Sequence, residues 1–459
     1  MSCHTEKSLV DVFRVSVARY PQKIALRYFG RDINYQELYD SARRFAGFLL
    51  SRNLKVGDRI GLLMPNIPQY AIAYFGTMMA GCIPVPLDIR DVPKRIEQVL
   101  DKTKPRLIVV SLREYHHLQQ YVQEKAWFKK KKTNDRLNFQ QKFLDFSAWP
   151  IGIVGVDAAD YFGFWKRLAY RHNPFDKFKK FTYDYWWHSA LRNPPLSEEK
   201  FRFCETALLQ SADSSEGREG EPVIATLTHK QLIANLEQIH LTLSQFMSKD
   251  ARVLSPLPWT HIFGATTCLN APIAVGATIV ISLKEIRFPI ALLRMLQEEK
   301  ITVFIGINKM FDALVMACRD LKNKEMEIGK FNLNLCVSGG GLMRAERKRE
   351  FFEHFGVPVS EGHGLSEAPV ICLNWPGSSK EGTLGKLMPG TEGMMVDGNL
   401  FIRGEQLMVG YYKDDEETNK AMNGGWLNLG GDISLDGENF LIPKDPQHIR
   451  TCIAEEKNN

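Results

Sequence analysis

The sequence predicts an α/β protein built from two helix-flanked, largely parallel sheets and a small C-terminal β module. Short apolar runs that suit buried strands alternate with segments of helix length over most of the chain. From about Gly385 the pattern changes to short runs punctuated by glycine, which is typical of a barrel-like all-β unit. The 459 residues, 44% hydrophobic and 24% charged, exclude collagen, coiled-coil and wholly disordered chains.

The predicted elements follow in order from local patterns. Asn34 followed by Glu37 is typical of a capping box, and it predicts an amphipathic helix through Arg52. Six short apolar runs predict buried strands: RIGLLM (59–64), LIVV (107–110), RVLSPL (252–257), TIVI (278–281), TVFIGI (302–307) and LNLCV (333–337). Most of these runs are separated by segments of helix length, so we expect open parallel sheets with helices on their faces.

The cysteine pattern and the N-terminal residues indicate the cellular compartment in which we expect the protein. The eight cysteines are scattered and form no CxxC pair, so we expect reduced thiols, mostly in the core, rather than a zinc site or a disulfide framework. The N-terminal MSCHTEKSLV has no apolar core of a secretion signal. Charged residues interrupt every hydrophobic run before the length of a membrane-spanning helix is reached. We expect a cytoplasmic protein, with a peripheral position at the inner membrane face as one hypothesis.

One segment, residues 127–190, differs in composition from the rest. It carries nine Lys and three Arg against six acidic residues, which equals the chain's whole net charge of +6, and 18 of the 49 aromatic residues. Basic residues interleaved with aromatic rings suit an anionic membrane surface. The alternative is an aromatic-rich insertion that packs on its own domain. Nucleic acid is not expected as a partner, because no stacking motif or arginine stripe accompanies the charge.

A glycine loop follows one of the predicted strands. In VSGGGL (337–342), the residues Ser338, Gly339, Gly340 and Gly341 would let the backbone closely approach a planar or anionic ligand. Open parallel sheets bind ligands at the carboxyl ends of their strands, so this is a candidate binding loop. A tight turn without a ligand is the alternative.

Two further polar loops are candidate sites. In SEGHGLSE (360–367), Ser366 and Glu367 place a hydroxyl beside a carboxylate, a pair that suits phosphate and Mg²⁺; a polar helix N-cap is the alternative. In WLNLGGD (426–432), Asp432 follows two glycines and could accept hydrogen bonds from both ribose hydroxyls. A solvated turn aspartate would look the same.

In this order, these stretches resemble the AMP-binding family of adenylate-forming enzymes, most closely its long-chain fatty acyl-CoA synthetases. The resemblance runs from about Leu9 to Leu441 and also includes LPWTHIFG (257–264) and FIRGEQLMVGYY (401–412). It implies that a fatty acid or other carboxylic acid reacts with ATP to give an acyl adenylate and pyrophosphate. The acyl group would then pass to coenzyme A.

The long-chain subgroup is suggested by ALLQ (207–210) and LTHKQLIANLEQ (227–238), which flank the family's phosphate loop. The resemblance also implies site roles. Glu367 would hold Mg²⁺, Ser366 would sit at the α-phosphate, and His261 would lie near the acyl carboxylate, although a core histidine is the alternative there. The implied ATP- or AMP-binding residues are Ser338, Gly339, Gly340, Gly341, His363, Gly364 and Asp432, with backbone facing adenine, His363 stacking on it and Asp432 on the ribose.

The phosphate loop departs from the family's pattern. Where members have a loop like YTGGTTGxxKG, this chain has SADSSEGREGEPVIAT (211–226), in which Ser214, Ser215 and Gly217 remain plausible phosphate donors. Four carboxylates and no lysine occupy this stretch. Two like charges about 4 Å apart repel by roughly 4 kcal/mol at an effective dielectric constant of about 20, so we expect weak MgATP binding.

The resemblance implies an AMP-binding N-terminal domain over residues 1–441. Its expected parts are a first α/β subdomain (1–126 with part of 191–260), the basic aromatic insertion (127–190), a second α/β subdomain (260–384) and the β module (385–441). The family's lid domain with its catalytic lysine is not expected in the tail, 442–459, where Lys444 and Arg450 match no family position.

Two hypotheses about function follow. One is a ligase that is weak alone or completed by a separate chain that supplies the lid. The other is a pseudoenzyme that keeps the acyl or nucleotide pocket at a membrane surface or partner.

Overall fold

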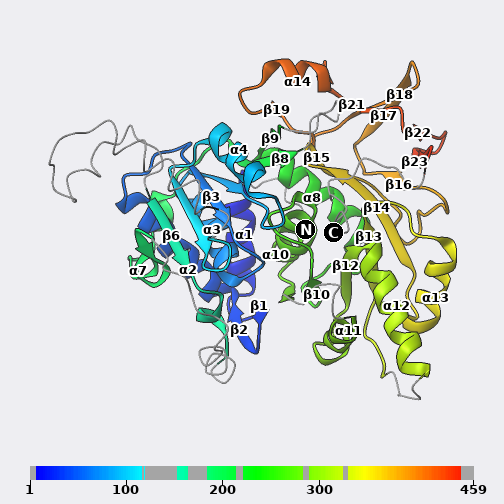
Figure 1. The fold of residues 1–459 in the computed structure, drawn as a ribbon, viewed down its shortest axis with the longest axis horizontal. Coiled ribbons are helices and arrows are strands. Elements are labelled where there is room, and N and C mark those ends of the chain that lie inside the picture. The colour runs from blue at the N-terminus through cyan, green and yellow to red at the C-terminus, as the bar shows by residue number, and fades with distance from the viewer. Residues whose placement is uncertain are drawn as a thin grey trace.

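The computed structural model describes residues 7–115, 118, 152–163, 183–212, 221–282, 289–323 and 329–445. The ribbon is organised around two sheets with helices on their faces (Figure 1). Helix α1 (Leu9–Arg19) packs against α2, α3, α8 and α10, so it joins the helices of the first half of the chain to those of the second. The hydrophobic core is continuous through this helix layer.

The larger sheet has eleven strands among the described residues, in the order β2-β1-β11-β10-β12-β13-β14-β15-β16-β23-β22. Pairing is parallel from β1 to β14 and antiparallel at both edges. The strands are β1 (Ile24–Tyr28), β2 (Arg31–Asn34), β10 (Arg252–Ser255), β11 (Thr278–Ile281), β12 (Val303–Ile307), β13 (Leu335–Gly339), β14 (Val359–Leu365), β15 (Ala368–Leu373), β16 (Gly385–Leu387), β22 (Ile433–Leu435) and β23 (Phe440–Pro443).

Helices cover both faces of the parallel part of this sheet (Figure 1). On one face, α11 (Pro289–Glu298), α12 (Asn308–Asn323) and α13 (Ala345–Phe355) pack in a row. On the other, α8 (His229–Leu243) packs against α10 (Ala271–Val275). Helix α10 continues from the short α9 (Ile262–Gly264) and a π-helical turn, η3 (Ala265–Asn270).

The second sheet has five parallel strands in the order β4-β3-β5-β6-β7 among the described residues. They are β3 (Arg59–Leu63), β4 (Ile83–Pro86), β5 (Leu107–Ser111), β6 (Gly152–Val156) and β7 (Tyr185–Trp186). The accompanying helices are α2 (Tyr35–Ser51), α3 (Pro68–Met79), α4 (Pro93–Thr103) and α7 (Trp187–Leu191), with 3-10 turns at Ala158–Tyr161 and Glu198–Lys200. Every residue of α3 is buried, as expected for a helix that is apolar on all sides.

Two smaller sheets complete the fold. Strands β8 (Thr206–Ala212), β9 (Val223–Thr228) and β19 (Gly410–Tyr411) form an antiparallel sheet. Strands β17 (Glu392–Val396), β18 (Asn399–Arg403), β20 (Met422–Asn423) and β21 (Trp426–Gly430) form the other, in the order β17-β18-β21-β20, and α14 (Asp415–Ala421) precedes β20. In the described residues this four-stranded sheet is open rather than a closed barrel.

The predicted α/β class with two largely parallel sheets is confirmed. The capping prediction also holds, because Asn34 Oδ1 accepts from the Glu37 N–H at 2.7 Å and α2 follows. Two strand pairings join segments that lie far apart in the chain. Strand β1 pairs with β11 in the large sheet, and β6 pairs with β5 inside the second sheet although it belongs to the 127–190 segment. Pairing between distant segments carries no local signal, which is why sequence patterns missed it.

The thiols behave as expected. The described cysteines are free, and five of these six are buried. Within the described ranges, the helices are too short or too polar to cross a membrane.

Candidate functional site

Two of the predicted loops lie side by side because they follow neighbouring strands. Strands β13 and β14 run parallel, and Gly339 at the end of β13 pairs with Gly362 of β14. The carboxyl ends of parallel strands meet at one edge of a sheet, where open α/β folds bind ligands. The glycine loop (338–342) and the HGLSE motif (363–367) therefore share this edge.

The glycine loop has space for backbone only. Gly340 and Gly341 have φ values of 89° and 118°, in the range that other residues rarely adopt. At Gly339 a Cβ atom would lie 2.6 Å from the ring of Phe263, so a side chain there would clash. The loop is thus a tight turn, and it also leaves peptide groups open to a neighbouring ligand.

Hydrogen bonds from inside the protein fix the loop. The Ser338 hydroxyl is buried and donates to Asn308 Oδ1 at 2.6 Å. Asn308 Nδ2 in turn donates to the Leu342 carbonyl at 3.1 Å, so one side chain bridges both ends of the loop. Ser338 therefore shapes the loop, and its predicted contact with a nucleotide stays a prediction.

A buried ion pair holds the chain just after the loop. Glu361 Oε1 accepts from the Met343 N–H at 2.8 Å, and Glu361 Oε2 pairs with Lys348 Nζ at 2.9 Å. The Glu361 side chain is only 3% exposed. Because breaking a buried ion pair leaves an uncompensated charge, both partners matter for the position of this segment.

The HGLSE motif lies on the β14–β15 hairpin and not at a helix N-cap. Ser366 Oγ donates to the Ser211 carbonyl at 3.0 Å, which ties the hairpin to the end of β8. Glu367 is buried, and its Oε1 accepts from the Tyr411 hydroxyl at 2.7 Å. The Glu367 carbonyl accepts from the Met408 N–H at 2.7 Å. The carboxylate is thus held in one orientation by β19.

His363 and Gly364 complete the hairpin's contribution to the site. His363 is buried opposite Cys372 of β15. At Gly364 a Cβ atom would lie 2.0 Å from the Pro369 carbonyl oxygen, so the two strands of the hairpin approach closely only because this residue is glycine.

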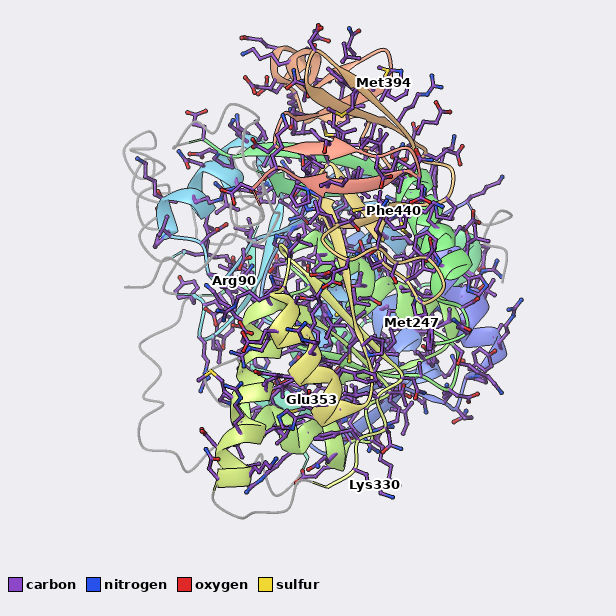
Figure 2. The ribbon with its side chains drawn as sticks, turned by 90° about the vertical axis from the view of Figure 1, so that its right-hand side faces the viewer. Arg90, Met247, Lys330, Glu353, Met394 and Phe440 are labelled. Atoms are coloured by element: carbon purple, nitrogen blue, oxygen red, sulfur yellow. The ribbon has the colours of Figure 1, made fainter. Side chains whose placement is uncertain are left out.

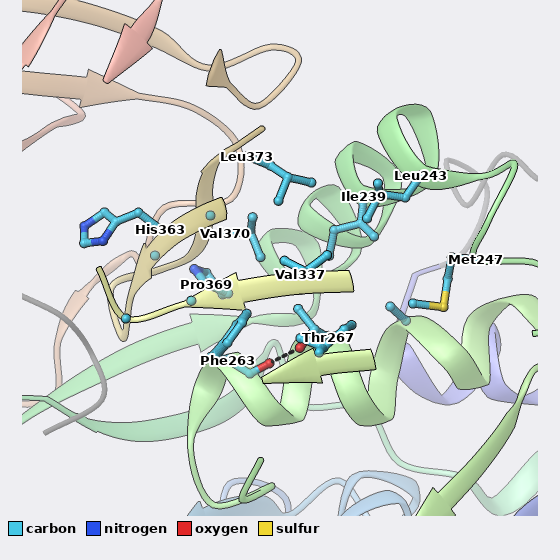
Figure 3. Close-up of a pocket in the computed structure, with 16 residues that line it drawn as sticks. Ile239, Leu243, Met247, Phe263, Thr267, Val337, His363, Pro369, Val370 and Leu373 are labelled. Atoms are coloured by element: carbon cyan, nitrogen blue, oxygen red, sulfur yellow. Dashed lines mark hydrogen bonds between the residues drawn. The ribbon is translucent and has the colours of Figure 1, made fainter. Parts of the chain in front are cut away.

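The loop and the hairpin border an apolar pocket (Figure 3). Gly339, Gly340, His363 and Gly364 line it, and Figure 3 shows His363 and Met247 at its opposite ends. A mainly apolar lining with a few polar groups is typical of small-molecule binding sites. The structure therefore brings four of the predicted residues to one cavity.

Helices and strands supply the apolar walls of this pocket. They include Ile239, Leu243, Phe263, Ala271, Ile305 and Val337. Thr267 of η3 also lines it, but its hydroxyl donates to the carbonyl of Phe263 in α9 at 2.7 Å (Figure 3). Since few polar groups line the pocket, these apolar walls suit a hydrocarbon and not a polar ligand.

His261 lies outside the lining of this pocket. It is the N-cap residue of α9 and is partly exposed, next to Thr260, whose carbonyl accepts from Gln210 Nε2 at 3.1 Å. Its charge acts on Asp88. Burial favours the neutral form of Asp88, but hydrogen bonds from Arg90 and a smaller contribution from His261 hold the pKa of this carboxyl below its usual value. The role of His261 at an acyl carboxylate stays a prediction.

Asp432 is exposed and also lies outside the pocket lining. It directly precedes β22, and its carbonyl accepts from the Lys444 N–H at 2.8 Å. Strands β16 and β23 separate β22 from β15 in the sheet. The contact of Asp432 with ribose stays a prediction.

Only the residues at the two ends of the phosphate loop lie in the part of the chain that the structure describes. Ser214, Ser215 and Gly217 lie outside the described residues. The flanking residues Ala212 and Val223 pair across the β8–β9 hairpin. Because Ser366 bonds to Ser211, the loop starts directly beside the HGLSE hairpin.

Comparison with known families assigns the chain. The profile of the AMP-binding enzyme family matches residues 13–150 and 217–412. The chain belongs to this family.

Curated relatives match nearly the whole chain. A long-chain-fatty-acid–CoA ligase of Escherichia coli O6:H1 is 29% identical over 459 residues, which covers 95% of this chain and 76% of the relative. One from Bacillus subtilis is 26% identical, covering 96% and 76%. The acyl-CoA ligase sidI of Aspergillus fumigatus is 26% identical, covering 90% and 67%.

Solved structures share the fold. The anthranilate CoA ligase AuaEII, in complex with anthranoyl-AMP, superposes with a TM-score of 0.76 at 20% identity, covering 96% of this chain and 78% of that one. The N-terminal domain of FACL13 from Mycobacterium tuberculosis superposes with a TM-score of 0.72 at 17% identity, covering 95% and 100%.

Several residues of the site were not predicted from the sequence. Asn308 and Glu361 fix the glycine loop, Tyr411 orients Glu367, and Met247 closes the far end of the pocket. Tyr411 lies within FIRGEQLMVGYY, a run that the sequence analysis had noted. Its contact with Glu367 becomes visible only in the structure, where β19 pairs with β9. Glu361 lies within SEGHGLSE (360–367) but received no predicted role, and Asn308 and Met247 lie in no motif.

Proposed function

We propose that this chain activates a long-chain carboxylic acid with ATP and passes the acyl group to coenzyme A. In the first step a carboxylate oxygen bonds to the α-phosphorus of ATP while the bond to pyrophosphate breaks, which gives an acyl adenylate. The observation that carries the proposal is the apolar pocket bordered at one end by both the glycine loop and the HGLSE hairpin. The long-chain-fatty-acid–CoA ligases among the relatives support the class of substrate.

The chain's own residues would act mainly by positioning. Gly339, Gly340 and Gly364 leave their backbone open to an adenine ring, and His363 offers an aromatic face beside it. The apolar walls would hold the acyl chain and exclude water from the carboxylate end. Holding two reactants in line supplies a large part of the rate enhancement in such reactions.

Glu367 fits the expected Mg²⁺ ligand. Magnesium is usually held by one or two carboxylates together with substrate phosphates, so one well-oriented acidic residue is enough. Glu367 is buried, and the Tyr411 hydroxyl fixes one oxygen of its carboxylate, so this carboxylate has a set orientation as the candidate ligand. When bound, Mg²⁺ would neutralise charge on the phosphates. Ser366, the preceding residue, would face the α-phosphate.

The acidic phosphate loop favours a second candidate function. Asp213, Glu216, Glu219 and Glu221 stand where the family's loop wraps the triphosphate, and residues 211–226 contain no lysine. A chain under selection for tight MgATP binding would not be expected to carry this charge. The second candidate is a pseudoenzyme that binds acyl or nucleotide ligands without turnover. If the chain is instead a ligase, one hypothesis is that a separate chain supplies the lid.

Exchange of labelled pyrophosphate into ATP, with Mg²⁺ and palmitate present, separates the two candidates. A ligase gives slow exchange that is above the rate of the Glu367→Ala variant, because adenylation is reversible and needs the metal ligand. Rates equal to that of the variant would overturn the ligase and leave the pseudoenzyme.

We also propose that the basic part of the 127–190 segment binds anionic membrane surfaces. The run Lys129 to Lys132 lies outside the described residues, whereas β6 and Trp187 of the same segment are part of the core. Deleting the whole segment would therefore damage the fold, and point substitutions are the better test.

Replacing Lys129 to Lys132 with serine should reduce binding to phosphatidylserine vesicles, and more so at low salt. The matched control changes the net charge equally, by replacing four exposed lysines elsewhere: Lys230, Lys322, Lys330 and Lys413. Equal loss in both variants would show that only net charge matters, and the membrane role would be rejected.

A further inference from the structure

The far end of the pocket adjoins a second cavity. This second cavity is small, and it is lined by Leu236, Ile239, His240, Met247, Ala271, Ala274 and Val275. Three of these residues, Ile239, Met247 and Ala271, also line the pocket that reaches the glycine loop. The two cavities are therefore neighbours that share a wall.

Met247 is the part of this wall most able to move. It is 2% exposed, and it lies at the end of the pocket opposite His363 (Figure 3). Methionine is unbranched and has three rotatable side-chain bonds, so it can change conformation at low cost. Ile239 is stiff at χ1, and Ala271 has no rotamers, so neither can open the wall.

We propose that Met247 determines the acyl chain length that the pocket accepts, and that the second cavity is where longer hydrocarbon tails would extend. This inference rests on the proposed function, because it takes the first pocket as the acyl site. A tail that points away from His363 reaches Met247, since these two residues lie at opposite ends of the pocket. Beyond Met247 the space is lined mainly by Leu236, Ala274 and Val275, which suit a saturated tail.

The length dependence of binding follows from the hydrophobic effect. Each methylene that leaves water for an apolar wall tightens binding about fourfold. In the wild-type chain this gain should continue until the tail meets Met247 and then stop. In Met247→Ala the limit should move by about three carbon atoms, the number of heavy atoms the substitution removes, or by more when the tail enters the second cavity.

The test is equilibrium binding of saturated fatty acids from octanoate to stearate, measured by displacement of a fluorescent fatty acid. Met78→Ala is the matched control, because Met78 is 3% exposed and lies on α3, away from both cavities. Ala274→Leu, added to Met247→Ala, narrows the second cavity and should restore the wild-type length limit. Met247→Val is the fallback if the alanine variant does not fold, and it should shift the limit in the same direction.

The outcomes separate this inference from the proposed function. A longer limit in Met247→Ala, no change in Met78→Ala and reversal by Ala274→Leu support it. If wild-type protein binds fatty acids but the limit is the same in Met247→Ala, the role of Met247 is wrong and the acyl pocket stands. If wild-type protein binds no fatty acid of any length, both proposals fail.

Discussion

His229, the first residue of α8, couples stability to pH. Its Nδ1 accepts from the Leu9 N–H at 3.2 Å, and its ring lies 5.7 Å from that of Phe203. Burial lowers the pKa of His229 to about 4. The unfolded chain takes up a proton near pH 6.5 and the folded chain does so only near pH 4, so the free energy of unfolding should fall as the pH drops through this window.

The size of this effect is about 3 kcal/mol, from about 1.36 kcal/mol per pKa unit. His229→Asn should keep the hydrogen bond from Leu9, since an amide oxygen can take the place of Nδ1. In this variant the free energy of unfolding should no longer fall between pH 6.5 and 4. Urea unfolding at several pH values measures it. His354→Asn, on α13, controls for loss of a histidine. An unchanged acid limb in His229→Asn would rule out His229 as the cause.

At the same scale, the sequence marked residues that need special backbone geometry. Gly339, Gly340 and Gly364 were predicted, and the structure explains each by a positive φ or a Cβ clash. The sequence indicated no role for Glu361 or Met247. An ordinary glutamate or methionine becomes part of a site only through the side chains that the fold brings to it.

At the scale of elements, strands and caps were predictable, while their partners were not. The runs at 107–110 and 278–281 became β5 and β11 as expected from apolar content alone. The HGLSE hairpin was harder, since a polar helix cap and a tight turn share the same residue types. Its place beside the glycine loop follows from the parallel pairing of β13 with β14, which depends on residues far apart in the chain.

Helix α8 links the elements of the site through buried polar groups. Asn235 Nδ2 donates to the Val370 carbonyl at 2.9 Å, and Gln238 Nε2 donates to the Pro389 carbonyl at 2.9 Å. One face of α8 thus holds β15 and the start of the C-terminal strands, while Ile239 and Leu243 line the pocket. Because these hydrogen bonds tie α8 to β15 and to Pro389, α8 forms a fixed wall against which an acyl chain could pack.

For the whole molecule, the fold class was predictable from alternating helices and strands, but the division into sheets was not. Strand β1 pairs with β11 in the large sheet and β6 pairs with β5 in the second sheet, and neither pairing has a local signal in the sequence. Asp432 shows the same limit. Its motif was recognisable, yet it directly precedes β22 at the sheet edge and lies outside the pocket lining.

On this proposal, one site holds an acyl chain and an adenosine together. A stable palmitoyl adenylate analogue, in which a sulfamoyl group replaces the phosphate, should therefore raise the melting temperature of the protein. Joining two ligands that bind adjacent subsites makes the second contact intramolecular, so the analogue should raise the melting temperature more than palmitate and adenosine added together at the same concentrations. A shift no larger than that of palmitate alone would contradict a joint acyl-adenylate site.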